Sequence, residues 1–324
     1  KKRKKRNFKK LGLMLMLSAL TISVSCSDDS SSESNTIASI ASKNAEFSTL
    51  VTALNKTGLT ATLNGSGNFT VFAPTNQAFS TFLSANGFSS LDDVPVAVLK
   101  EILLNHVVND ELFSNELTTG YVKSLGKGSA SSTNTLSLFI NTTSGVKING
   151  VSNVTAADID ASNGVIHKVD AVIGLPTIVT HAVANPNFTS LVAALTRSDQ
   201  ADQNFVGILS GTASSPFTVF APTNTAFSSL LTEFGWSSLG DVPETVLEKT
   251  LKYHVVAGAN VLSTQLTNNM SVGTFLGQNF TITTTGGAKI TDANNRTSNI
   301  IATDVQCANG VIHVIDKVIV PSLD

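Results

Sequence analysis

The chain has 324 residues, of which 42% are hydrophobic and 14% charged, and its formal net charge is −2. A domain commonly takes about 100–200 residues, so the length predicts two domains, and the apolar content excludes a disordered chain. Residues 1–10 hold eight of the 21 Lys and Arg residues and none of the 23 acids, which leaves 13 basic residues in an acidic remainder. Because an acidic body repels phosphate backbones, nucleic acid is excluded as the expected partner.

The first residues have the composition of a secretion signal. Basic residues 1–10 precede an apolar run over residues 11–24, which Cys26 follows closely. The run is shorter than the roughly 20 apolar residues that span a bilayer, so it fits a signal peptide better than a membrane helix. We therefore predict a signal peptide over residues 1–26 and a flexible tether over residues 27–35.

The segment around Cys26 resembles a bacterial lipobox, in which the cysteine becomes the lipid-bearing first residue of the mature protein. Ser23 stands where that pattern usually has Leu, and the residues Ser27-Asp28-Asp29 resemble the surface-export signal of Bacteroidota lipoproteins. The resemblance implies a lipidated Cys26 and an outer-membrane lipoprotein, either exposed on the cell surface or facing the periplasm. The alternative is an ordinary cleaved signal in which Cys26 is incidental.

The remainder of the chain contains two copies of one unit. The segment Thr70–Phe79 (TVFAPTNQAF) recurs as Thr218–Phe227 (TVFAPTNTAF), and Asn163–His167 (NGVIH) recurs as Asn309–His313. The common order and nearly constant spacing indicate duplication of a whole domain, since the period is too long for a solenoid repeat. We place copy one at residues 36–175 and copy two at residues 176–324.

The first half of each copy is predicted to be mainly helical. In copy one, apolar residues at helical spacing predict a helix over residues 47–54. The strand Phe69–Ala73 runs into Pro74, which cannot donate to a ladder, and Thr75 or Asn76 can cap the helix that follows. Residues 91–108 predict a capped turn and another helix. Copy two has extra residues over 196–215, which we interpret as a longer loop.

The second half of each copy is predicted to be mainly strands. In copy one these strands are expected at residues 136–140, 145–148 and 165–173, and Asn163-Gly164 is a hairpin signal. Helices come first, strands mostly later, and no βαβ alternation is visible. The pattern predicts an α+β fold with a largely antiparallel sheet.

The repeated motifs resemble the two signature blocks of the fasciclin-type domain, and the resemblance covers roughly residues 36–324. It implies two tandem domains, each a wedge-shaped β-sandwich of about seven strands flanked by helices. It also implies a non-enzymatic adhesion or extracellular-matrix protein that engages a protein or polysaccharide partner at the cell surface. Only Trp236, Tyr121 and Tyr253 could stack on sugars, which favours a protein partner.

The resemblance also suggests candidate contact residues. In animal members, integrin-related contacts are attributed to a Tyr-His pair between the blocks and to an Asp-Ile segment before the second block. The pair occurs here as Tyr253-His254, whereas copy one has Asn105-His106. The Asp-Ile segment corresponds to Asp158-Ile159 and, less closely, to Asp304-Val305. These positions form the candidate binding surface.

The histidines could in principle carry chemistry. A catalytic interpretation joins His106 and His167 with Asp92, Asp93 or Asp170 in acid–base work, as in a hydrolase of envelope polymers. A structural interpretation is favoured, because His167 lies in a strand of β-branched residues where an imidazole usually bonds the main chain. We expect that histidine to bond near the TVFAPTN turn. The residues expected to be structural are Asn76, His106, His167, Asn224 and His313.

No catalytic residue, metal or cofactor is predicted. The chain has no paired cysteines and no Asp-x-Asp-x-Asp loop, and Gly126–Ser129 resembles only the end of a phosphate-binding loop. Cys307 occupies the position of Ala161 in copy one and is interpreted as a small buried hydrophobe. A purely structural envelope spacer without a specific ligand is a third possibility for the function.

Overall fold

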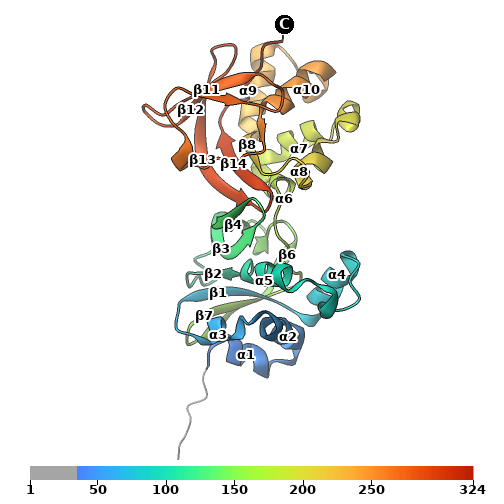
Figure 1. Ribbon diagram of the computed structural model, residues 1–324, viewed down its shortest axis with the longest axis vertical. Coiled ribbons are helices and arrows are strands. Elements are labelled where there is room, and N and C mark those ends of the chain that lie inside the picture. Colours follow the sequence, from blue (N-terminus) through green and yellow to red (C-terminus); the bar gives the residue numbers. More distant parts are fainter. Residues whose placement is uncertain (1–34, 324) are drawn as a thin grey trace, which may run out of the picture. The chain divides into compact units, whose positions relative to one another are not determined.

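The computed structural model describes residues 35–323, so Cys26, the predicted signal peptide and nearly all of the predicted tether lie outside the described residues. Two successive segments repeat one architecture, and we call them domain 1 (from residue 36) and domain 2 (from residue 176) (Figure 1). Each combines helices with a seven-stranded sheet, which confirms the predicted α+β class and the number of strands.

Domain 1 begins with helices, as predicted. Thr75 caps α4 by accepting a hydrogen bond from the Ala78 N–H, and Ser90 with Asp93 forms a capping box at the turn before α5. The α-helices are α1 (Ile37–Lys43), α2 (Ser48–Thr57), α3 (Thr60–Asn64), α4 (Asn76–Ala85) and α5 (Val96–Leu104), with 3₁₀ turns η1 (Ala45–Phe47) and η2 (Leu91–Asp93).

The strands of domain 1 close into a barrel whose spatial order follows the chain order. They are β1 (Phe69–Pro74), β2 (Val107–Val108), β3 (Gly120–Gly128), β4 (Ser131–Asn141), β5 (Lys147–Ile148), β6 (Ser152–Ala161) and β7 (Gly164–Val169). Neighbouring strands are antiparallel except β1 and β7, which are parallel. The predicted hairpin joins β6 to β7.

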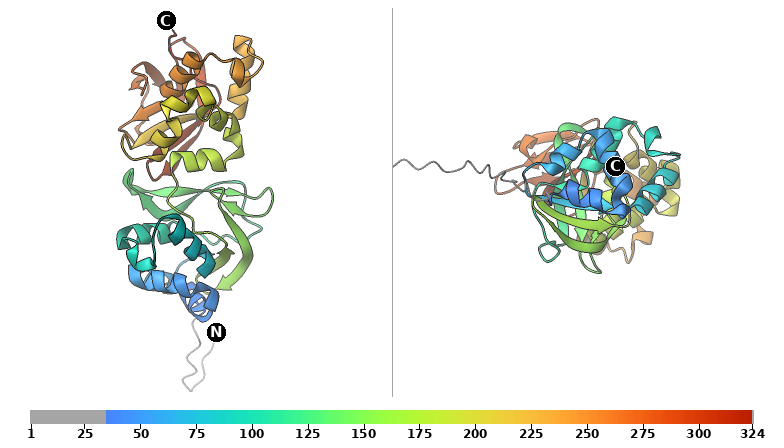
Figure 2. Two further views of the ribbon diagram at one scale, coloured as in Figure 1. Left: turned by 90° about the vertical axis from the view of Figure 1, so that its right-hand side faces the viewer. Right: turned by 90° about the horizontal axis from the view of Figure 1, so that it is seen from below.

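Strand β1 lies between two apolar clusters, because alternate side chains of a strand point to opposite faces. Val71 and Ala73 belong to the cluster that the helices cover, whereas Phe72 belongs to the cluster inside the barrel. The left view of Figure 2 shows the helices of domain 1 (blue to teal) gathered on one side of its green strands. One short, fully buried strand thus joins the helical layer to the barrel.

Domain 2 repeats this order of strands in an open sheet whose edges are β10 and β9, with the parallel pair formed by β8 and β14. Its helices are α6 (Ile178–Ala184), α7 (Thr189–Leu195), α8 (Phe205–Ser210), α9 (Asn224–Phe234) and α10 (Glu244–Tyr253), with turns η3 (Pro186–Phe188), η4 (Ser198–Gln203), η5 (Leu239–Asp241) and η6 (Ser263–Gln265). Its strands are β8 (Phe217–Pro222), β9 (Val255–Ala257), β10 (Met270–Gly273), β11 (Asn279–Thr283), β12 (Lys289–Thr291), β13 (Thr297–Cys307) and β14 (Gly310–Ile315).

The prediction of a simple long loop over residues 196–215 is wrong. This stretch contains η4 and α8, and α8 is the counterpart of α3 in domain 1. The equivalence follows from Asn163 and Asn309, whose side chains bond the carbonyls at the ends of α3 and α8, respectively. The polar residues on both sides of α8 concealed it, because the helix is only six residues long.

Candidate functional site

The two sequence motifs form adjacent strands in each domain. In domain 1, β1 pairs with β7 so that Phe72 stands opposite His167, and β8 pairs with β14 in the same way in domain 2. A Cβ on Gly164 would lie 2.0 Å from the carbonyl oxygen of Phe69. Glycine alone permits this close approach, which explains why the second motif contains it.

His167 is held by main-chain groups. Its Nε2–H donates to the Leu112 carbonyl at 2.9 Å, and its Nδ1 accepts from the Asp158 N–H at 3.2 Å. The ring lies 5.6 Å from the Phe72 ring, centroid to centroid. Burial lowers the pKa of His167, so the imidazole is neutral at pH 7.

His313 repeats part of this arrangement in domain 2, but its Nδ1 has no hydrogen-bond partner among the described residues. Its Nε2–H donates to the Val261 carbonyl at 2.9 Å, the ring stacks on Phe220 at 5.4 Å, and burial lowers its pKa. The expected hydrogen bond between this histidine and the TVFAPTN turn is therefore wrong in both domains. The ring bonds instead the loop that follows β2 in domain 1 and the loop that follows β9 in domain 2.

His106 is fully buried at the end of α5. Its Nδ1–H donates to the Ile102 carbonyl at 2.8 Å, and its Nε2 accepts from the Ile173 N–H at 2.9 Å. The Phe72 N–H donates to the His106 carbonyl, so this residue also holds β1. Burial lowers the pKa of His106 to about 4.

His254 makes the same pair of bonds in domain 2. Its Nδ1–H donates to the Thr250 carbonyl at 2.7 Å and its Nε2 accepts from the Ile319 N–H at 3.2 Å. Burial lowers its pKa to about 4. His106, His167 and His254 each need a neutral ring with one donor and one acceptor for these bonds, whereas His313 bonds through Nε2 alone. The four motif histidines therefore bond main-chain groups in the interior.

Two asparagines per domain complete the internal links. Asn76 accepts from the Thr49 N–H and donates to the Ala45 carbonyl, and Asn224 makes the equivalent bonds in domain 2. Asn163 accepts from the Ile37 N–H at 2.9 Å and donates to two carbonyls at the end of α3. The interpretation of Asn163-Gly164 as a hairpin signal alone missed the bonds of the Asn163 side chain. The recurrence of the pair as Asn309-Gly310 could have indicated this second role.

The Asp158-Ile159 segment forms a strained bulge in β6. Asp158 has φ of +61° and Asp304, its counterpart in β13, has φ of +59°. Such angles are uncommon outside glycine, and a short polar side chain that bonds locally tolerates them best. Both Asp158 carboxylate oxygens accept from Ser114, one from its N–H and one from its hydroxyl, and this lowers the pKa of Asp158. Ser263 bonds Asp304 in the same way.

The candidate binding surface is only partly exposed. Asp158 is exposed, and Ile159 and Asp304 are half-buried. Tyr253 and His254, at 0% and 3% exposure, lie in the interior, as does Val305. The Tyr253 hydroxyl donates to the Asn279 carbonyl at 2.8 Å, and burial raises its pKa to about 12. The expectation that Tyr253-His254 presents a contact surface is corrected by this burial.

Asn105 replaces that tyrosine in domain 1 with a different internal link. Its side-chain amide donates to the Gly174 carbonyl at 2.9 Å and accepts from the Ser124 hydroxyl at 2.8 Å. It is fully buried. The difference between the two copies at this position is therefore a change of interior bonding.

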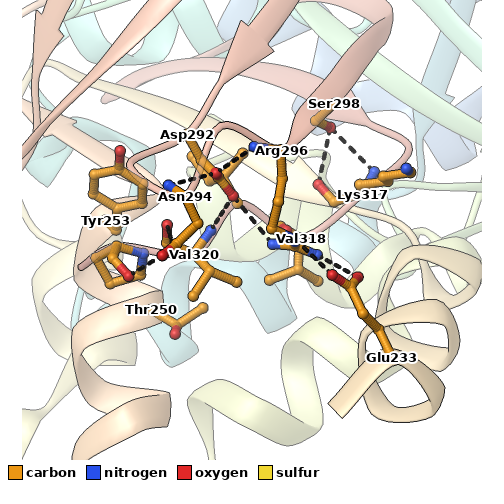
Figure 3. Close-up of polar contacts among 12 residues, drawn as sticks. Glu233, Thr250, Tyr253, Asp292, Asn294, Arg296, Ser298, Lys317, Val318 and Val320 are labelled. Atoms are coloured by element: carbon orange, nitrogen blue, oxygen red, sulfur yellow. Dashed lines mark hydrogen bonds and ion pairs between the residues drawn. The ribbon is translucent and has the colours of Figure 1, made fainter. Parts of the chain in front are cut away.

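A polar cluster lies beside Tyr253 in domain 2 (Figure 3). Asp292, 5% exposed, accepts from the Arg296 guanidinium at 3.1 Å and from the Val320 N–H at 3.0 Å. Arg296 also forms a two-bond pair with Glu233 on α9, which lowers the pKa of Glu233. The hairpin between β12 and β13 thereby fixes the segment that ends the described chain.

Domain 1 has an open groove, whereas the equivalent region of domain 2 is filled by side chains. The groove encloses about 760 Å³, and its apolar lining includes Phe82, Phe88 and Val98. No Asp, Glu, His, Lys or Cys lines it. In domain 2 the counterparts Leu230, Trp236 and Val246 pack around a space of only about 10 Å³. The open groove therefore offers apolar surface without an ionisable group.

Among residues 35–323, no three His, Cys, Asp or Glu side chains are arranged to hold a metal ion. None of the helices over that range combines the length and hydropathy that a bilayer crossing requires. Cys307 is fully buried, as predicted, and burial raises the pKa of its thiol.

Comparison with known proteins identifies the family. The fasciclin domain profile matches residues 45–176 and 186–321. The chain belongs to the fasciclin domain family. Protein sll1483 of Synechocystis sp. is 40% identical over 139 residues, which are 43% of this chain and 72% of that protein. Human periostin is 30% identical over 276 residues, which are 80% of this chain and 29% of periostin.

A solved structure shares the fold. It is a FAS1 domain pair from the insect cell adhesion molecule Fasciclin I, with a TM-score of 0.50, 20% sequence identity, and coverage of 87% of this chain and 98% of that chain. The similarity supports the assignment of two fasciclin domains in tandem. The chain spans under a third of periostin, so the activity of a whole relative is not transferred by the match.

Proposed function

We propose that this chain is an envelope-anchored binding protein that contacts a protein or polysaccharide outside the cell through its two fasciclin domains. The observation that carries this proposal is the placement of the four motif histidines. All four are buried and bonded to main-chain atoms as neutral rings, so the residues that the two copies share support the interior. Tandem modules on one anchor gain avidity when both engage one surface.

The rival function is hydrolysis of an envelope polymer by His and Asp. It needs ionisable groups with shifted pKa values that face an open pocket. The groove of domain 1 has no ionisable side chain in its lining, and the nitrogens of His106 and His167 are taken up by separate main-chain bonds. The adhesion role of the insect protein that shares the fold adds support for binding.

The binding proposal is tested with the Cys26→Ala chain, purified and immobilised, against purified envelope polysaccharides and surface-protein fractions. Saturable binding without consumption of the polymer is the expected result. Release of soluble sugar or peptide with multiple turnovers would replace the proposal with the hydrolase. Absence of saturable binding to every fraction would leave the structural spacer as the function and reject binding.

The anchor is tested in cells with a labelled fatty acid. We expect incorporation into the wild-type chain and its loss in Cys26→Ala. Cys307→Ala is the matched control, because it removes the only other cysteine and should keep the label. Label retained in Cys26→Ala, or absent from the wild-type chain, would reject lipidation at Cys26.

A further inference from the structure

The two domains differ in what covers the bulged segment of the strand before the second motif. In domain 2 this segment, Asp304–Ala308, is covered by the hairpin that β3 and β4 form in domain 1, which we call the arm (residues 123–137). Lys123 Nζ donates to the Asp304 carbonyl at 2.7 Å, and the Gln306 N–H donates to the Ser137 hydroxyl at 3.0 Å. Beneath the arm, Val305 and Gln306 are 3% and 1% exposed.

The tip of the arm contacts the same segment through its main chain. The Ala130 N–H and the Ser129 hydroxyl both donate to the Ala308 carbonyl, at 2.9 and 3.0 Å. A Cβ on Gly128 would lie 2.3 Å from the Ala308 Cα. On the domain 2 side, each of these bonds uses a carbonyl or an N–H. Recognition of the arm therefore depends on the shape of the bulged main chain more than on its side chains.

Domain 1 has the same main-chain shape, and no hairpin among residues 35–323 covers it. Its counterpart, Asp158–Ser162, has the same positive φ at its aspartate and pairs with the following strand in the same register. Its Ser162 N–H bonds the Asn35 carbonyl, just as the Ala308 N–H bonds the Pro176 carbonyl. Asp160 and Ser162 are exposed. We call residues 158–162 the free edge.

The free edge is more acidic than its covered counterpart. In domain 2, Gln306 and Asn260 bond each other through their amides at 3.0 and 3.2 Å. Thr70 bonds the Asp110 carbonyl as Thr218 bonds the Ala259 carbonyl, so Glu111 occupies the position of Asn260. Asp160 occupies the position of Gln306. Two carboxylates thus replace a neutral amide pair, and the partner must supply positive charge.

We propose that the free edge of domain 1 binds a lysine- or arginine-bearing β-hairpin from a fasciclin domain of a second protein, in the way that Asp304–Ala308 binds the arm. A second copy of this chain does not fit as the donor. Its own arm already covers its own domain 2, and its other equivalent hairpin, residues 270–283, contains no Lys or Arg. This inference deepens the proposed binding function by naming a partner class for one surface.

The first test uses a disulfide-cyclised peptide of residues 121–139, which carries Lys123 and Lys127, added to the full chain. The arm of the chain occupies domain 2, so the peptide has the free edge as its site. We expect the Asp160 N–H to gain protection from hydrogen exchange. We also expect affinity to fall at least about tenfold in Asp160→Lys and to fall with added salt. Asp202→Lys, the same charge change at an exposed acid elsewhere, should bind normally.

A peptide with both lysines changed to glutamate is the matched probe and should bind at least about tenfold more weakly. Equal binding of the two peptides, or protection confined to residues outside 158–162, would overturn the proposal. These outcomes leave the screen for envelope partners unaffected, so failure of this inference and failure of the binding function are distinguishable.

The second test removes the requirement that a peptide fold alone. In a three-domain chain, residues 36–176 precede a complete copy of residues 36–324. Pro176 is then followed by Thr36, which caps α1 as Thr177 caps α6, so the arm of the first domain precedes the free edge of the middle domain with the native spacing. We expect the Asp160 N–H of the middle domain to exchange more slowly than in the two-domain chain. Unchanged exchange there would reject the free edge as a hairpin site, whatever the peptide does.

Discussion

At the scale of single residues, the buried histidines make the fold dependent on protonation. His106 and His254 each donate from Nδ1 and accept at Nε2, so an added proton on Nε2 would face a main-chain N–H. Burial holds both pKa values near 4, against an ordinary value of 6.5. Between these values the unfolded chain binds protons that the folded chain does not, and stability therefore rises with pH.

We predict that the free energy of unfolding falls as the pH is lowered from 6.5 to 4, and that His254→Gln flattens this dependence. The non-titrating amide removes one of the groups whose proton uptake favours the unfolded chain. Asp292 raises and Arg296 lowers the pKa of His254, and both effects are smaller than that of burial. Urea unfolding at intervals across this pH range measures the slope.

Asp158→Asn is the control for this slope. Its hydrogen bonds with Ser114 hold the pKa of Asp158 below 3.8, so its contribution is present above that pH and is lost only as the pH falls through the lowered value. The control should therefore leave the slope between pH 6.5 and 4 unchanged. A wild-type stability that is flat over this range, or a His254→Gln slope equal to that of the wild type, would contradict the prediction.

At the scale of elements, the hairpin between β12 and β13 explains why the region around Trp236 is closed. Arg296 lies over the Phe234 ring, with its guanidinium carbon 5.8 Å from the centroid, and Phe234 stacks on Trp236 at 5.0 Å. Glu233 and Asp292 hold the guanidinium from two sides. Domain 1 has Ala85 and Asn86 at the positions of Glu233 and Phe234, so it cannot build this closure.

We predict that Arg296→Leu lowers the stability of domain 2 by about 3 kcal/mol, because it leaves the buried carboxylate of Asp292 without its cation. Lys252→Ala is the control, since it breaks a more exposed pair with Glu248 on one helix and should cost about 0.5 kcal/mol. Urea unfolding followed by the fluorescence of Trp236 reports on domain 2 in both variants. Equal losses in the two variants would contradict the role of the buried pair.

The repeated elements were predictable from the sequence, whereas their differences were not. Apolar spacing, Pro74 and the threonine cap were visible because each acts locally. The spacing between the HVV and NGVIH segments differs by only two residues between the copies, which suggested similar loops. That small difference hides two opposite changes. The segment that contains the arm is longer in domain 1, where Leu117 and Ile148 are 31 positions apart, than in domain 2, where Leu266 and Ile290 are 24 apart. The hairpin that carries Arg296 is instead longer in domain 2.

The candidate surface was harder to predict for a similar reason. Burial of Tyr253 depends on β10 and β11, far along the chain, and no local pattern reveals it. The partners of the motif histidines were not predictable, because they lie about 55–67 residues away along the chain. Asp158 was found through a resemblance, and the strain that marks it is a property of the main chain.

At the scale of the whole described chain, the arm makes the two domains one unit. The bonds of Lys123, Ser129, Ala130 and Ser137 come from a hairpin that is long in domain 1 and short in domain 2. Asn185 on the domain 2 side also donates to the Tyr121 hydroxyl, and the Tyr121 ring packs edge-on against His181. Because the tip of this hairpin contacts the main chain of domain 2, a change at the tip can release the arm without disturbing either core.

We predict that Gly128→Ala releases the arm. The added Cβ would lie 2.3 Å from the Ala308 Cα, and main-chain atoms on both sides leave no flexible side chain to move aside. The N–H groups of Ala130 and Gln306 should then lose protection from hydrogen exchange, and the radius of gyration in solution scattering should increase. Gly120→Ala, on the same strand with no atom within 4 Å of the added Cβ, should change neither quantity. If Gly128→Ala kept both amides protected, the arm would be held by contacts other than its tip, such as those of Lys123 and Ser137, and this prediction would be wrong.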